Sequence, residues 1–244
     1  MFSTLTNALG LNPLKVDTLI DTPMVMVGDT LRGVIAIQGT TADKTINHIS
    51  LHLNTIAEDD TDNGDIRRVH TLGTVYLADN LTINAHERLH LPFELALSPE
   101  TPVTNILCAK NQTKLWLETK VDVAATLDSK DNDEIYTLPT PVMANFLQAM
   151  EQAGFRLQKT DVEKGMVTTP YGTSSFGCYQ EFEFSCFKLG LNSVEVTFLP
   201  KADYTYVVLE IDRAFRSDSY KVVGLNPHMT INDMVYLIQQ TIGV

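Results

Sequence analysis

Apolar and polar residues alternate along most of the chain, and this pattern predicts β-strands. The clearest run is 114–127, where Leu115, Leu117 and Val121 alternate with polar neighbours, so we expect it to be the longest strand. The Asn63-Gly64 pair favours a tight hairpin turn. Further strands are predicted at residues 14–19, 31–38, 46–54, 66–77, 89–95, 178–187, 193–199 and 204–213.

The segment Leu138-Pro139-Thr140-Pro141 reads as a linker that divides these strands into two groups. We therefore predict a mainly all-β protein with an N-terminal β-sandwich at residues 1–139 and a C-terminal β-sandwich with flanking helices at residues 140–244. One short helix should follow the linker, capped by Thr140 and ended near Gly154. A second should begin at Thr230, with Asp233 completing a capping box.

The N-terminal segment has a short amphipathic pattern, in which Phe2, Leu5, Leu9 and Leu11 fall at roughly helical spacing. We interpret it as a lid on the first sandwich. Peripheral contact with a membrane is the alternative, which the absence of Lys and Arg in this segment disfavours.

The negative net charge of the chain disfavours negatively charged binding partners. The 244 residues carry a formal net charge of −12, which repels nucleic-acid phosphates and anionic lipid headgroups. We therefore expect no nucleic-acid partner and no integral membrane segment, since no apolar run reaches the roughly 18 residues that such a segment needs. The cysteines are Cys108, Cys178 and Cys186, and this sparse, odd set favours a reducing compartment, the cytoplasm.

Two acidic segments, residues 58–64 and 128–134, invite a calcium interpretation. Aligning Asp59 as the first ligand puts Gly64 at the sixth position, but Thr61 replaces a carboxylate and His70 stands where the bidentate Glu belongs. Because the flanks read as strands, we favour solvated turns for both segments.

The metal candidates are four histidines, His48 and His52 on one expected strand and His86 and His90 on another. They alternate away from apolar residues, so they should point outward and could share a zinc or nickel ion if the two strands are neighbours. Residues four apart on a strand lie about 13 Å apart, too far to chelate one ion alone. Four ordinary exposed histidines are the favoured alternative.

No nucleophile elbow, Walker A, HExxH or dinucleotide-binding pattern occurs, so we expect no catalytic residues and no cofactor. Asp212 and Arg213 end an apolar strand, either as its exit into solvent or as a salt bridge between the two lobes. Trp116 points away from Leu115 and Leu117, and is either a surface anchor for a partner or, in the favoured interpretation, part of a second core face.

Several sequence blocks, taken in order, resemble the bacterial sporulation-control protein family. They are Val16-Asp17-Thr18, Val27-Gly28-Asp29, Ala153-Gly154-Phe155, Gln180-Glu181-Phe182-Glu183-Phe184, Val194-Glu195-Val196-Thr197-Phe198-Leu199-Pro200 and Leu209-Glu210-Ile211-Asp212-Arg213. The resemblance covers essentially the whole chain. It implies two tandem arrestin-like β-sandwich lobes.

The resemblance also implies a non-catalytic scaffold or regulator that binds protein partners through strand edges or the surface between the lobes. A metal- or small-molecule-sensing module that uses the outward histidines is the alternative, and an undetected hydrolase is a third. Pairing of an edge strand with its own copy would give a homodimer.

Overall fold

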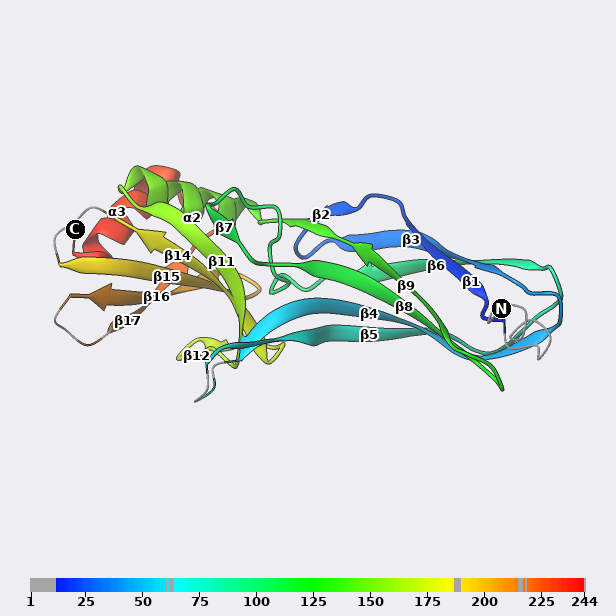
Figure 1. The fold of residues 1–244 in the computed structure, drawn as a ribbon. Coiled ribbons are helices and arrows are strands. Elements are labelled where there is room, and N and C mark those ends of the chain that lie inside the picture. Colours follow the sequence, from blue (N-terminus) through cyan, green and yellow to red (C-terminus); the bar gives the residue numbers. More distant parts are fainter. Residues whose placement is uncertain are drawn as a thin grey trace.

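The computed structural model describes residues 12–59, 61, 64–186, 190–214, 217 and 219–243, and it shows two lobes arranged end to end (Figure 1). The predicted amphipathic segment with Phe2, Leu5, Leu9 and Leu11 lies outside the described residues. Strands dominate both lobes, so the predicted mainly β class is confirmed. In the described part of the chain, neither helix has the length and hydropathy needed to cross a bilayer.

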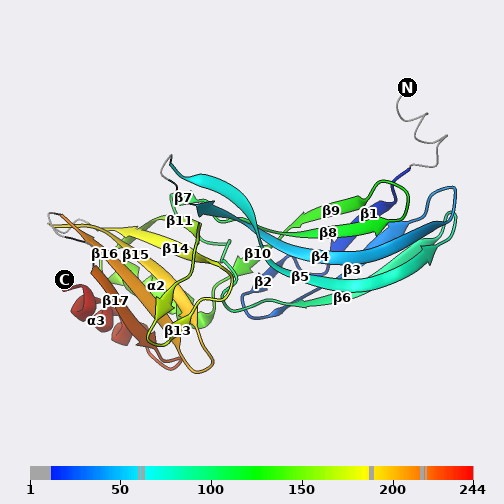
Figure 2. The same cartoon turned by 90° about the horizontal axis from the view of Figure 1, so that it is seen from below.

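The N-terminal lobe is a sandwich of two antiparallel sheets. One sheet has the order β1-β3-β6, and the other has the order β9-β8-β4-β5. A short parallel pair of β2 with β10 closes the end of the lobe that faces the C-terminal lobe (Figure 2). The strands are β1 (Lys15–Ile20), β2 (Met24–Met26), β3 (Thr30–Gln38), β4 (Lys44–Asp59), β5 (Ile66–Ile83), β6 (Arg88–Ala96), β8 (Leu115–Val123), β9 (Ser129–Glu134) and β10 (Tyr136–Leu138).

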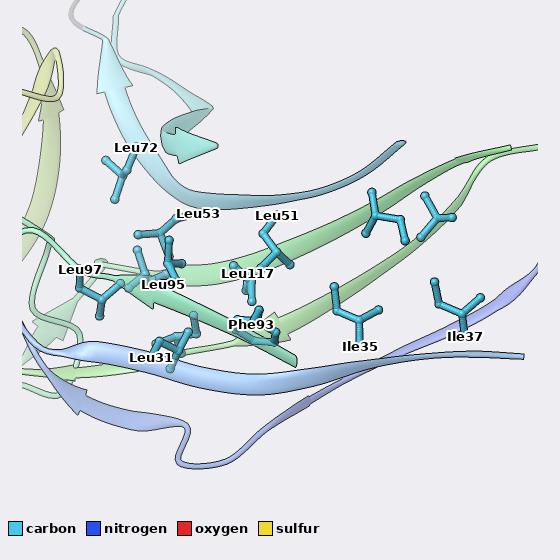
Figure 3. Packing of buried hydrophobic residues seen from close by; sticks show 14 of the residues in the cluster. Leu31, Ile35, Ile37, Leu51, Leu53, Leu72, Phe93, Leu95, Leu97 and Leu117 are labelled. Atoms are coloured by element: carbon cyan, nitrogen blue, oxygen red, sulfur yellow. The ribbon is translucent and has the colours of Figure 1, made fainter. Parts of the chain in front are cut away.

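The core of this lobe follows from the predicted alternation. Ile35 on β3 and Phe93 on β6 point across the sandwich toward Leu51 on β4 and Leu117 on β8, and all four are buried (Figure 3). Most of the side chains that alternate with them face outward, as period-two patterning predicts, but Ser50 and Asn54 on β4 are also buried, where the strand register shifts.

The C-terminal lobe is one antiparallel sheet with the order β17-β16-β15-β14-β11, covered on one face by two helices (Figure 1). A two-stranded hairpin, β12 with β13, lies on the opposite face. The elements are β7 (Lys110–Asn111), α2 (Pro141–Gln152), β11 (Arg156–Lys164), β12 (Thr168–Thr169), β13 (Gly172–Thr173), β14 (Cys178–Ser185), β15 (Leu191–Pro200), β16 (Thr205–Arg213), β17 (Ser219–Leu225) and α3 (Ile231–Ile242).

The second layer of this lobe differs from that of a sandwich because helices occupy the place of a second sheet. Phe146 and Met150 of α2 and Ile238 of α3 are fully buried against the apolar face of the sheet. Two amphipathic helices therefore bury the apolar sheet face that a second layer of strands would otherwise cover.

Both predicted helices are confirmed with their caps. The Thr140 hydroxyl accepts the backbone N–H of Met143, and Gly154 follows the helix with a φ of 94°. Thr230 and Asp233 form the expected reciprocal capping box at the start of α3. These caps depend only on local sequence, which explains why they could be predicted.

Two strand predictions were wrong. The longest strand is β5, with 18 residues, whereas β8 has 9 and ends before a turn in which Ala125 has a φ of 56°. The polar run 129–134 is strand β9 rather than a loop. It pairs with β8, and Asp131 accepts the backbone N–H of Thr18 at 2.7 Å, so backbone pairing outweighs the lack of apolar residues.

The lobes are joined by more than the linker. The expected boundary at residues 139 and 140 falls between β10 and α2, yet the sheet continues across it, because Glu58 on β4 pairs in parallel with Glu163 on β11. Lys110 on β7, which comes from the part of the chain before the linker, also pairs with Lys159 on β11. Hydrogen-bonded strands therefore run from one lobe into the other.

Candidate ligand groove on the C-terminal sheet

The outer face of the C-terminal sheet, opposite the helices, carries three neighbouring glutamates. Glu181, Glu195 and Glu210 lie on β14, β15 and β16, where each alternates with buried residues of the helix-facing side. Glu195 and Glu210 are directly paired in the strand register. The carboxylate oxygens of all three lie within 4.8 Å of one another. The register of three adjacent strands therefore concentrates negative charge at one point.

Burial and the neighbouring negative charges raise the pKa of two of these three glutamates. Burial, followed by the neighbouring carboxylate of Glu195, raises the pKa of Glu181 to about 8. Burial and the carboxylates of Glu210 and Glu183 raise the pKa of Glu195 to about 7. Glu181 and Glu195 therefore keep their protons to a higher pH than an ordinary glutamate does.

No salt bridge reaches these three glutamates within the described residues. Their one recorded side-chain hydrogen bond comes from the hydroxyl of Tyr220 on β17, which donates to Glu210 Oε1 at 2.5 Å. No lysine or arginine of the described chain therefore forms an ion pair with these glutamates, although the charge of Lys159 opposes part of the rise in the pKa of Glu195.

A second acidic group differs in this respect. Glu58, Asp161 and Glu163 also gather where β4 meets β11. Here Lys159 forms a short ion pair with Asp161, and Arg67 Nη2 lies 3.1 Å from Glu58 Oε2. Lysine and arginine side chains of the chain itself therefore balance the negative charge of this group, which lies where the two lobes join.

The three glutamates line a depression that we call the glutamate pocket, with a volume of about 270 Å³. Its residues are Met166, Val167, Thr168, Thr169, Tyr179, Glu181, Glu195, Thr197, Val208, Glu210, Tyr220 and Val222. The segment that leads into β12 borders one side, and β17 borders the other. Carboxylates and apolar walls thus meet in one concave site.

Exposed aromatic side chains extend this surface beyond the pocket. The rings of Tyr171 and Tyr206 stack with centroids 4.4 Å apart, and Tyr204 lies 6.1 Å from Tyr206. Tyr171, Tyr204 and Tyr220 are all exposed. Aromatic groups that keep a wet face are common at sites of protein contact.

The predicted histidine pairs are not brought together. His48 and His52 lie on β4, whose neighbours are β5, β8 and β11, whereas His90 lies on β6, beside β3 in the opposite sheet. His86 lies in the turn before β6. In the described residues, the groups with metal-ligand spacing contain no histidine. The condition for a shared ion, neighbouring strands, is therefore not met.

The acidic residues 58–64 lie partly outside the described residues, since 60, 62 and 63 are not among them. The Thr61 hydroxyl donates to the carbonyl of Gly64, which has a φ of 103°. This contact is typical of a turn between strands.

Asp212 and Arg213 lie away from the junction of the lobes. Asp212 accepts hydrogen bonds from the Asn192 side chain, and Arg213 donates to the carbonyl of Ile242 at the end of α3. A cation at a helix C-terminus satisfies a carbonyl that has no partner within the helix. The suggested salt bridge between the lobes is therefore replaced by contacts within the C-terminal lobe.

The junction is instead held by Gln180 and Glu100. The Gln180 amide accepts from Val103 N at 2.7 Å and donates to Val103 O at 2.8 Å and to Thr113 Oγ1 at 3.0 Å. The Glu100 carboxylate accepts from Ser175 and from Lys201 Nζ, the latter at 3.2 Å. Trp116 is half-buried on the outer side of β8, opposite Asn54, between its two expected environments.

Sequence reasoning missed the glutamate pocket. The signal was present as an acidic residue beside apolar ones in three strands, as in Val194-Glu195-Val196 and Leu209-Glu210-Ile211. Alternation showed that these acids face outward, but strand order and register decide whether they meet, and neither can be derived from single strands.

Comparison with known proteins shows the family to which this chain belongs. A family model described as SpoOM protein matches residues 2–215. The curated sporulation-control protein spo0M of Bacillus subtilis (strain 168) is 28% identical over 222 residues, covering 88% of this chain and 81% of that protein. The crystal structure of the Bacillus subtilis sporulation control protein superposes with a TM-score of 0.82 at 23% identity, covering 95% of this chain and 98% of the other.

Proposed function

Because the chain belongs to the SpoOM family of sporulation-control proteins, we propose that it is a non-catalytic regulator that binds a protein partner through the outer face of its C-terminal sheet. The observation that carries the proposal is the contrast between the two faces of this sheet. One face is covered by α2 and α3, while the other exposes Met166, Tyr171, Tyr204 and Tyr220 beside the glutamate pocket.

An exposed surface of this kind needs an explanation. Large apolar side chains scattered singly over a surface are ordinary, but several gathered around a concave site mark a contact surface. Tyrosine supplies large contact area at a low entropic cost, and it is enriched where partners bind. A regulator in the cytoplasm agrees with the three free cysteines, Cys108, Cys178 and Cys186.

The proposal is tested by crosslinked affinity purification of the tagged full chain from its own cells, read by mass spectrometry. The wild type should recover a specific protein in stoichiometric amount. Tyr220→Ser, on the outer face, should lose that protein, whereas Tyr76→Ser, an equally exposed tyrosine of the N-terminal lobe, should retain it. Recovery of the bait alone, or equal recovery by both variants, contradicts the proposal.

Homodimer formation stays a separate prediction. Within the described residues, β17 ends the sheet and has β16 as its one paired neighbour. An edge of this kind can pair with a second copy. Sedimentation at increasing concentration measures this directly, and a constant monomer mass contradicts it.

A further inference from the structure

The chemistry of the glutamate pocket specifies what it can hold. Its three carboxylates lie within 4.8 Å of one another and, in the described part of the chain, no lysine or arginine pairs with them. Half-buried carboxylates repel one another strongly where solvent screening is reduced. A cation that enters the pocket relieves this repulsion, so the electrostatics favour a positively charged ligand.

Thr197 gives a second and independent indication. It lines the floor of the pocket on β15 and is only 6% exposed. Its hydroxyl has no hydrogen-bond partner among the described residues. The side chain is otherwise enclosed, yet its hydroxyl oxygen is not sealed from solvent, so the hydroxyl opens into the pocket and is free to hydrogen-bond a ligand atom there. As an acceptor, it suits an N–H donor.

The side chains that line the walls of the glutamate pocket suit an organic cation better than a metal ion. Tyr179, Val208 and Val222 surround the carboxylates, with Met166 at the rim. Calcium and magnesium prefer a shell of oxygens completed by water, and apolar walls contribute nothing to such a shell. An alkyl chain gains from contact with the valines and methionine, and its cationic end gains from the tyrosine rings.

We propose that the glutamate pocket binds an alkyl chain that ends in an ammonium or guanidinium group. A lysine or arginine side chain of a protein partner presents this chemistry, and a free polyamine presents it as well. The inference deepens the proposed function and rests on it for the protein source of the cation. The pocket volume of about 270 Å³ suits one such chain.

The test follows the NMR methyl signals of the purified full chain, labelled with ¹³C in the methyl groups of methionine and valine. It is carried out at pH 8, where the pocket carries more negative charge than it does at lower pH. The probes are a tri-lysine peptide, spermidine, a tri-glutamine peptide and calcium chloride. We expect tri-lysine to shift the methyl signals of Met166, Val208 and Val222, and tri-glutamine to leave them unchanged. Shifts with both tri-lysine and spermidine indicate the shared cation chemistry, whereas shifts with tri-lysine alone indicate a protein source, and shifts with spermidine alone indicate a free polyamine.

Variants separate specific binding from general attraction to an acidic protein. The double variant Glu181→Gln/Glu195→Gln should weaken binding by at least about tenfold. Glu151→Gln, an exposed glutamate on α2, removes one charge elsewhere and should bind as the wild type does. Thr197→Val keeps the shape of the floor without the hydroxyl and should also weaken binding, with the remaining methyl spectrum reporting an intact fold.

Two results would overturn the inference. One is equal binding of tri-lysine by the wild type and the double variant. The other is a shift of the pocket methyl signals by calcium but by neither organic cation. Failure of the proposed function is separate: it appears as recovery of the bait alone in the affinity purification. Failure of the pocket inference alone appears as a partner that the double variant still recovers in full.

Discussion

At the scale of single residues, Glu181 gives the protein a pH-dependent stability. Its pKa is about 8 in the folded protein, against an ordinary value of 4.5. Between these values the unfolded chain releases the proton while the folded chain keeps it, so folding is favoured less as pH rises. Its contribution is fully present below about pH 4.5 and is lost as pH rises toward 8.

We therefore expect the free energy of unfolding to fall between pH 5 and pH 8, with Glu181 contributing on the order of 2 kcal/mol. Glu181→Gln removes the titrating group and should flatten this slope. Urea denaturation at several pH values measures it. Because Glu181 and Glu195 are neighbours, the substitution also changes the pKa of Glu195, so the difference between the two slopes reports this pair of carboxylates. Parallel curves for variant and wild type would show that the residue is not the origin of the slope.

The sequence pattern could predict which face of a strand each residue occupies, but not which residues of different strands become neighbours. The alternation in 178–187 and 204–213 correctly separates the buried Phe182 and Leu209 from the outward acids. Pairing of Glu195 with Glu210 depends on the register of two strands, and one shift in register would separate them. The same dependence separated the histidine pairs, whose strands belong to opposite sheets.

At the scale of secondary-structure elements, local signals were the most reliable. The capping residues of α2 and α3 were predicted because each cap contacts only its own first turn. By contrast, β9 has a fully polar sequence, and the hairpin β12–β13 has only two residues in each strand. β9 depends on its pairing with β8 and on the contact of Asp131 with Thr18, and strands of two residues are too short to show an alternating pattern.

Thr230→Ala tests the contribution of a cap. Its side chain accepts the N–H of Asp233, and the Asp233 carboxylate accepts the N–H of Thr230. Loss of the box should lower the free energy of unfolding by about 1 kcal/mol. Chemical denaturation measures it, with Thr41→Ala in an exposed turn as the control. A change no larger than that of the control would mean that packing alone holds α3.

At the scale of the whole molecule, the sheet and a few side chains join the lobes into one elongated body (Figure 2). Gln180→Leu should break the contact with Val103 and leave the latter's backbone groups without their partner. We expect a loss of about 1–3 kcal/mol in the free energy of unfolding. The matched control in the same denaturation series is Gln158→Leu, because among the described residues the Gln158 amide donates to the nearby carbonyl of Arg156 and to no other group. Equal losses in the two variants would rule out a special role for Gln180.

The two faces of the C-terminal sheet differ in what covers them. Helices bury one side of the C-terminal sheet, and the other side collects the glutamates and exposed tyrosines. The central claim is that this outer face contacts the protein partner. It is tested most directly by a photo-crosslinking amino acid introduced in place of Tyr220, with the same substitution at Tyr76 as the comparison. We predict a covalent partner adduct from position 220 in living cells and none from position 76. Adducts from position 76 alone, or from neither position, would contradict the claim.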